Sequence, residues 1–147
     1  MKQIKLSIEK KYKKRKVARS VSVREFNHVI LKSRLPILRR NRKLIRELLK
    51  DTQERFGIKL KSLAIMEDHI HLVTAVSNRK AFADAFRFFA GMIAIKLKRG
   101  KIWRQRIWSR IVKYGRDLDT AVCYVARNSV KAGCYDSADS FVILEGR

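Results

Sequence analysis

The pattern of hydrophobic and polar positions predicts a series of short elements between residues 21 and 133. Apolar residues at helical spacing before Gly57 predict the end of a first helix, and a tight turn at Glu67 and Asp68 joins two strands into a hairpin. In chain order the predicted elements are a strand at 21–31, a helix over 44–56, strands at 58–66 and 69–76, a helix between Asn78 and Gly100, a strand after Gly100, and a helix from near Asp117 towards Gly133.

This order predicts an α+β fold of the ferredoxin-like (RRM-like) type, an antiparallel sheet with helices packed on one side. The apolar residues 141–144 predict one more short strand. With 147 residues and 46% hydrophobic side chains, the chain can bury a core of ordinary size. We expect a basic arm over residues 1–20 and a single domain over 21–147, without internal repeats.

The charge of the chain points to a polyanionic partner. There are 36 Lys and Arg against 13 Asp and Glu, a formal net charge of +23, which favours nucleic acid over an anionic membrane. Nine Lys and Arg fall within residues 1–20; a basic arm of this kind binds a phosphate backbone or is simply a solvated terminus. The predicted contacts in the arm are Lys13, Lys14, Arg15 and Lys16.

The sequence also favours a cytoplasmic, nucleoid-associated protein without a membrane partner. The longest apolar stretch is the eight residues 88–95, far short of the ~20 that span a bilayer. Lysines and an arginine occupy the place where a signal peptide would have its apolar block. The two cysteines, Cys123 and Cys134, are too few for a disulfide scaffold and are expected to be reduced.

A basic segment with interleaved tryptophans lies between residues 85 and 116. It contains ten Lys and Arg, no acidic residue, and both Trp103 and Trp108. Positive charge follows a phosphate backbone and aromatic rings stack on unpaired bases; the alternative is an edge strand guarded by cations with the tryptophans packed inward. The residues predicted to bind nucleic acid here are Arg104, Arg106, Trp108 and Arg110.

The candidate metal ligands are His69 and His71. Two residues apart on a strand, their rings emerge on one face with Cα atoms ~7 Å apart, so they can share a divalent ion and leave positions free for a third ligand and a substrate oxygen. The alternative is a pair of half-buried core histidines. His28 has no partner nearby in sequence and is interpreted as structural or as a minor polar contact.

A second candidate pair, Tyr124 and Asn128, is four residues apart on the last predicted helix. This spacing stacks the two side chains on one face of the helix. That face lies beside the apolar side chains Leu118, Val122 and Val125, at the edge of the surface with which the helix packs on the rest of the domain. A packing tyrosine and a helix-capping asparagine are the alternatives.

Three runs carry a family resemblance: residues 66–73 (MEDHIHLV), 103–108 and 124–133 (YVARNSVKAG). They resemble the single-tyrosine HUH transposases of the insertion-sequence-200-like superfamily, and most closely the REP-associated tyrosine transposases (RAYT). The resemblance covers residues 21–133. It implies that His69, His71 and Asn128 bind Mg²⁺ or Mn²⁺ and that Tyr124, on a C-terminal helix, is the nucleophile.

The activity that this resemblance implies is that of a metal-dependent single-stranded DNA endonuclease and strand transferase. Cleavage near a DNA hairpin would proceed through a covalent 5′-phosphotyrosine, without a nucleotide cofactor, in a monomer or a homodimer. Two alternatives remain at this point. One is a non-catalytic RNA- or DNA-hairpin-binding module on the same fold, and the other is metal-dependent hydrolysis without a covalent step.

The chain departs from the family pattern at three places. Glu67-Asp68 stand where the family usually has Pro-Asn, Ile107 where it has Phe, and Asn128-Ser129 where it has Asn-Pro. None of these changes removes a reacting atom. The two carboxylates beside the histidines could join the metal shell or attract a second ion.

Overall fold

A computed structural model describes residues 18–131 of the chain, except for the side chain of Ser129. Lys13, Lys14, Arg15, Lys16, Cys134 and the strand expected at 141–144 lie outside the described residues. The elements are β1 (Phe26–Lys32), a 3₁₀ turn η1 (Arg39–Asn41), α1 (Arg42–Phe56), β2 (Lys59–Ile65), β3 (His69–Ala75), α2 (Arg79–Lys96), β4 (Trp108–Val112) and α3 (Arg116–Lys131).

The four strands form one antiparallel sheet in the order β2-β3-β1-β4. β1 therefore lies in the middle, paired with β3 on one side and β4 on the other. The predicted α+β, ferredoxin-like class is confirmed. The predicted hairpin is also present, since the backbone N–H of Met66 donates to the carbonyl of His69 across the turn.

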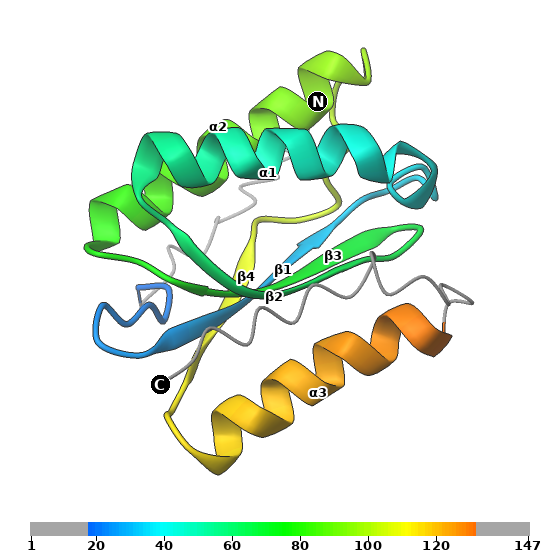
Figure 1. The fold of residues 1–147 in the computed structure, drawn as a ribbon. Coiled ribbons are helices and arrows are strands. Elements are labelled where there is room, and N and C mark those ends of the chain that lie inside the picture. The colour runs from blue at the N-terminus through cyan, green and yellow to red at the C-terminus, as the bar shows by residue number, and fades with distance from the viewer. Residues whose placement is uncertain (1–17, 132–147) are drawn as a thin grey trace, which may run out of the picture.

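The helices cover both faces of the sheet (Figure 1). α1 and α2 pack on one face, as expected, whereas α3 lies on the opposite face, so the expected placement of helices on one side does not extend to α3. The reason is a second apolar patch on the sheet. Small residues of α3 and of three strands form it: Ala64, Val73, Val112, Ala121 and Val125.

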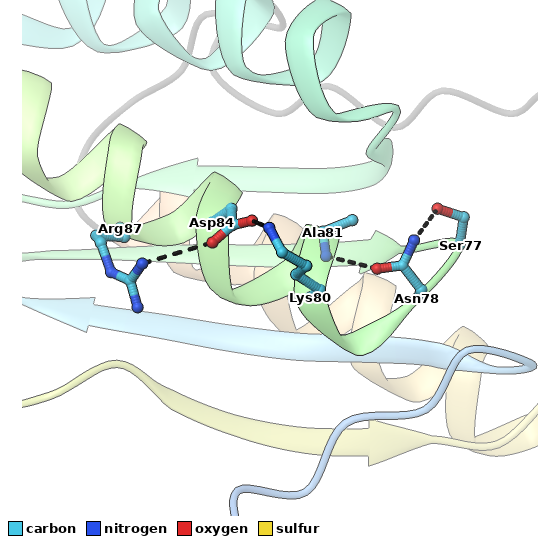
Figure 2. A network of polar contacts seen from close by, with 6 residues as sticks. All are labelled: Ser77, Asn78, Lys80, Ala81, Asp84 and Arg87. Atoms are coloured by element: carbon cyan, nitrogen blue, oxygen red, sulfur yellow. Dashed lines mark hydrogen bonds and ion pairs between the residues drawn. The ribbon is translucent and has the colours of Figure 1, made fainter.

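The larger core lies between the sheet and the helices α1 and α2. Its largest fully buried side chains include Phe82, Phe86 and Phe89, which lie on one face of α2. α2 begins at a side-chain cap, because Oδ1 of Asn78 accepts a hydrogen bond from the backbone N–H of Ala81 at 2.7 Å (Figure 2). Figure 2 also shows Asp84 between Lys80 and Arg87 on the exposed side of this helix.

Two boundaries differ from the predicted ones by more than two residues. β1 begins at Phe26 instead of residue 21, because Asn27 accepts from the backbone N–H of Ser22 (2.8 Å) and donates to its carbonyl (2.9 Å), which folds the preceding residues into a loop. α2 ends at Lys96, before Gly100. Within residues 18–131, no helix is long and apolar enough to span a membrane.

Candidate functional site

The face of the sheet that α3 covers carries most of the polar candidates. Strand pairing places Lys32 opposite His69 and Ile30 opposite His71, while Trp108 lies opposite Ile30 on the other side of β1. Because side chains alternate along a strand, His28 and Lys32 share the face of Ile30. Two neighbouring strands, β1 and β3, thus bring all three histidines of the chain to one surface.

His69 and His71 lie side by side, with ring centroids 4.8 Å apart and planes at 77°. Nδ1–H of His69 donates to Oδ1 of Asp68 at 2.6 Å. Nδ1 of His71 shares a hydrogen bond with Nε2 of His28 at 3.1 Å. Each of the two predicted ligands therefore has its Nδ1 engaged by a neighbour and its Nε2 left for another partner.

The electrostatics keep the buried rings neutral. Burial, followed by the positive charges of neighbouring side chains, lowers the pKa of His71 to about 3. Burial and then Arg110 lower the pKa of His28 to about 4. The hydrogen bond from His69 lowers the pKa of the Asp68 carboxyl. Both buried imidazoles are neutral at pH 7, which is the form that ligates metals.

Tyr124 approaches this cluster from α3. Its ring centroid lies 5.7 Å from that of His71 and 6.1 Å from that of His28, with both contacts edge-on. The tyrosine is 52% exposed and lines an open hollow of about 450 Å³ together with Asn128 and Arg127. The predicted nucleophile is therefore both next to the histidines and accessible from solvent.

Asn128 lies one helical turn beyond Tyr124, as its spacing predicts. Its amide nitrogen is buried and has no hydrogen-bond partner among residues 18–131. The amide nitrogen thus forms no hydrogen bond within the described part of the fold, and a half-turn about the last side-chain torsion exchanges nitrogen and oxygen.

These donors fit a divalent ion. Two neutral imidazoles with Nδ1 held from behind are the usual arrangement of metal-binding histidines, and the Asn128 amide, on the same side of α3 as Tyr124, could supply an oxygen after a half-turn of its last torsion. In the described part of the chain, no three His, Cys, Asp or Glu side chains are grouped to hold a metal. The predicted set contains only two such side chains, the histidines, because its third member is the amide of Asn128.

The structure separates the two carboxylates that replace the family's Pro-Asn. The Asp68 carboxylate accepts from His69, so it supports a predicted ligand from behind. The Glu67 carboxylate instead lies 4.0 Å from Arg39.

The basic and aromatic candidates are divided among several surfaces. Trp103 is turned inward, since its Nε1–H donates to the carbonyl of Ala90 at 2.9 Å. Trp108 is 42% exposed and lies edge-on to His28, 5.8 Å away. Trp103 thus follows the inward alternative, whereas Trp108 borders the histidine cluster.

The three arginines predicted to bind nucleic acid also differ in position. Arg110 donates to both carboxylate oxygens of Asp117, at 3.0 and 3.2 Å, and so connects β4 with the start of α3. Arg106 lines a second hollow, of about 540 Å³, beside α2 together with Arg87. Arg104 is exposed, and its backbone N–H donates to the carbonyl of Lys32.

Sequence reasoning allowed a polar contact of His28 but missed that its partner is His71. The chain separates this residue from His71 by 43 positions, and only the pairing of β1 with β3 brings them together. The alternation of side chains in 26–32 indicated on which face of its strand His28 lies. The sequence did not show which strands are neighbours in the sheet, so the contact with His71 could not be predicted.

The chain matches one family profile, and its fold is similar to that of a solved structure. The profile of the family described as "Transposase IS200 like" matches residues 27–115. The fold is similar to that of a REP-associated tyrosine transposase bound to a REP hairpin (TM-score 0.72, 15% identity, 82% of this chain and 76% of that one). A protein from Deinococcus radiodurans R1 assigned as a transposase gives a TM-score of 0.43 at 17% identity over 79% of this chain and 95% of that one.

A search of curated protein sequences gave no significant match. The family profile covers more than half of the 147 residues, so the chain belongs to the IS200-like transposase family.

Proposed function

We propose that the protein is a metal-dependent single-stranded DNA endonuclease and strand transferase that cuts beside DNA hairpins through Tyr124. The observation that carries this proposal is the convergence of Tyr124, on α3, with His71, on β3, at a ring distance of 5.7 Å. The similar transposase bound to a REP hairpin supports hairpin DNA as the substrate class. In this proposal residues 21–147 form one catalytic domain and residues 1–20 form a basic arm.

The proposed reaction is a phosphoryl transfer to a phenol. The Tyr124 oxygen forms a bond to the scissile phosphorus while the bond from phosphorus to the 3′ oxygen breaks. The phenol proton leaves to solvent, and the released strand takes up a proton to become a 3′-hydroxyl. The downstream strand stays attached as a 5′-phosphotyrosine, and attack by another 3′-hydroxyl reverses the step and joins strands.

The residues proposed to hold Mg²⁺ or Mn²⁺ are His69, His71 and Asn128. When bound, such an ion polarises a non-bridging phosphate oxygen and stabilises the charge of the transition state. The protein's own groups would orient the reaction: β3 carries the two imidazoles, and α3 carries Tyr124, whose ring lies 5.7 Å from that of His71. Trp108 offers an exposed aromatic ring beside this site for an unpaired base.

The test is a search for DNA covalently attached to the protein. Full-length protein is incubated with a library of single-stranded hairpin DNA and Mn²⁺ or Mg²⁺, and the products are separated on a denaturing gel. We expect an adduct with the wild type and none with Tyr124→Phe. Tyr114→Phe is the matched control, since Tyr114 is exposed and contacts Phe26, away from the histidines.

Two other outcomes would replace the proposal. Cutting without an adduct, retained in Tyr124→Phe, would show hydrolysis without a covalent step. Tight binding with neither adduct nor cutting would show a non-catalytic hairpin-binding module.

A further inference from the structure

His28 is buried in the middle of the sheet and faces the predicted ligand His71. Only 5% of its surface and 3% of that of His71 are exposed. Its Nε2 lies 3.1 Å from Nδ1 of His71, and the ring planes are 22° apart. The small angle allows the N–H of one ring to point at the lone pair of the other, so the pair shares a single proton between two nitrogens.

The location of that proton decides what His71 can bind. If Nδ1 of His71 carries the proton and donates it to His28, then Nε2 of His71 keeps a free lone pair. If His28 is the donor, His71 carries its proton on Nε2 and cannot ligate an ion through that atom. A buried neutral imidazole thus has two tautomers of opposite function, and its partner selects between them.

We propose that His28 is a positioning residue that accepts the Nδ1–H of His71 and thereby holds His71 in the tautomer with a free Nε2. This inference rests on the proposed function, because it assigns His28 a role in the metal site proposed there. The arrangement repeats that of the neighbouring ligand, in which Nδ1–H of His69 donates to Asp68. The two ligands are thus held from behind by different groups, a carboxylate and a second imidazole.

The packing around His28 supports this role over that of a simple filler. Trp108 lies edge-on to the His28 ring at 5.8 Å, and Tyr124 lies edge-on at 6.1 Å. Strand pairing holds its backbone between Val73 of β3 and Arg110 of β4. The ring is therefore restrained by both neighbouring strands and by α3, which fixes the direction in which Nε2 points.

The first test reads the tautomer directly. Long-range proton–nitrogen NMR correlations on the full-length, metal-free wild type are expected to show His71 protonated at Nδ1 and bare at Nε2. Protonation of His71 at Nε2 would overturn the proposal, whatever the protein does to DNA.

The second test measures Mn²⁺ affinity by titration calorimetry. We expect His28→Leu to weaken Mn²⁺ binding ~10- to 100-fold, the usual effect of losing a partner behind a ligand. His28→Gln keeps an acceptor oxygen near the position of Nε2 and is expected to stay within a few-fold of the wild type. Ile30→Val, an apolar change on the same strand and face, is the matched control.

The outcomes separate the two proposals. If His71→Ala abolishes Mn²⁺ binding but His28→Leu binds as the wild type does, the role of His28 is wrong and the metal site stands. If the wild type binds no Mn²⁺, or His71→Ala binds as well as the wild type, the metal site fails and the role of His28 fails with it. Should His28→Leu not fold, the tautomer measurement on the wild type decides alone.

Discussion

Oδ1 of Asp68 accepts a hydrogen bond from Nδ1–H of His69, its neighbour in the chain, at 2.6 Å. Asp68 is one of the residues that depart from the family's usual sequence. Its carboxylate is hydrogen-bonded to Nδ1 of His69, the ring nitrogen that is not proposed to bind the metal. A carboxylate in this place makes the imidazole a stronger ligand than an amide does. The departure is consistent with a working metal site.

Replacement of Asp68 is expected to weaken metal binding. Asp68→Ala should reduce Mn²⁺ affinity ~10-fold or more, and Asp68→Asn, which keeps an acceptor oxygen, should reduce it less. Titration calorimetry of the full chain measures both. Glu67→Ala is the control, because Glu67 lies near Arg39 instead; an equal effect of Glu67→Ala and Asp68→Ala would contradict this assignment.

The buried histidines predict a loss of stability in acid. In the folded protein the pKa of His28 is about 4 and that of His71 about 3, against ~6.5 in an unfolded chain. Between about pH 6.5 and 4 the unfolded state binds protons that the folded state does not, so the free energy of unfolding falls as the pH falls through this window.

Urea unfolding at several pH values between 4.5 and 8 measures this slope. His28→Gln removes one of the two titrating rings, so we expect its stability to depend less steeply on pH than that of the wild type. A variant with an unchanged slope would show that His28 does not titrate in this way.

The cap of α2 makes a measurable contribution to stability. Removal of the side-chain oxygen in Asn78→Ala leaves the N–H of Ala81 without its partner, which should lower the free energy of unfolding by ~1 kcal/mol. Ser77→Ala, which loses only the 3.3 Å contact between Ser77 and Asn78, should change it by less than ~0.5 kcal/mol. Urea unfolding at pH 7 compares the two.

Trp108 and Arg106 should affect DNA binding in different ways. Trp108→Ala removes an exposed ring beside the histidines, and we expect single-stranded DNA affinity to fall by ~1–3 kcal/mol with the salt dependence unchanged. Arg106→Ala should weaken binding to all sequences and lower the slope of affinity against salt by ~0.7. Fluorescence titrations at several salt concentrations distinguish these effects; a changed slope in Trp108→Ala would argue against stacking.

Local patterns were sufficient to predict most of the fold. The apolar spacing before Gly57 and the turn at Glu67 and Asp68 each depend on a few neighbouring residues, so one sequence reveals them. The start of β1 was wrong because the side chain of Asn27 folds the preceding residues back through Ser22, which no periodicity shows.

Contacts between distant segments were the part that the sequence could not supply. The position of α3 on the opposite face depends on which small residues of the sheet meet Ala121 and Val125. The contact between His28 and His71 depends on the order of the strands. The functional roles of Tyr124 and Asn128 stay predictions.

The central position of β1 makes the alignment of the strands a condition for activity. This strand contributes no proposed ligand, yet Ile30 is paired with both His71 and Trp108. A slip of β1 by a single residue would turn its whole set of side chains to the other face. His28 would then leave His71 and the face of the sheet that α3 covers. If the protein has the proposed activity, strand cutting is expected to be lost in misaligned molecules, so an assay of that activity would also report correct folding.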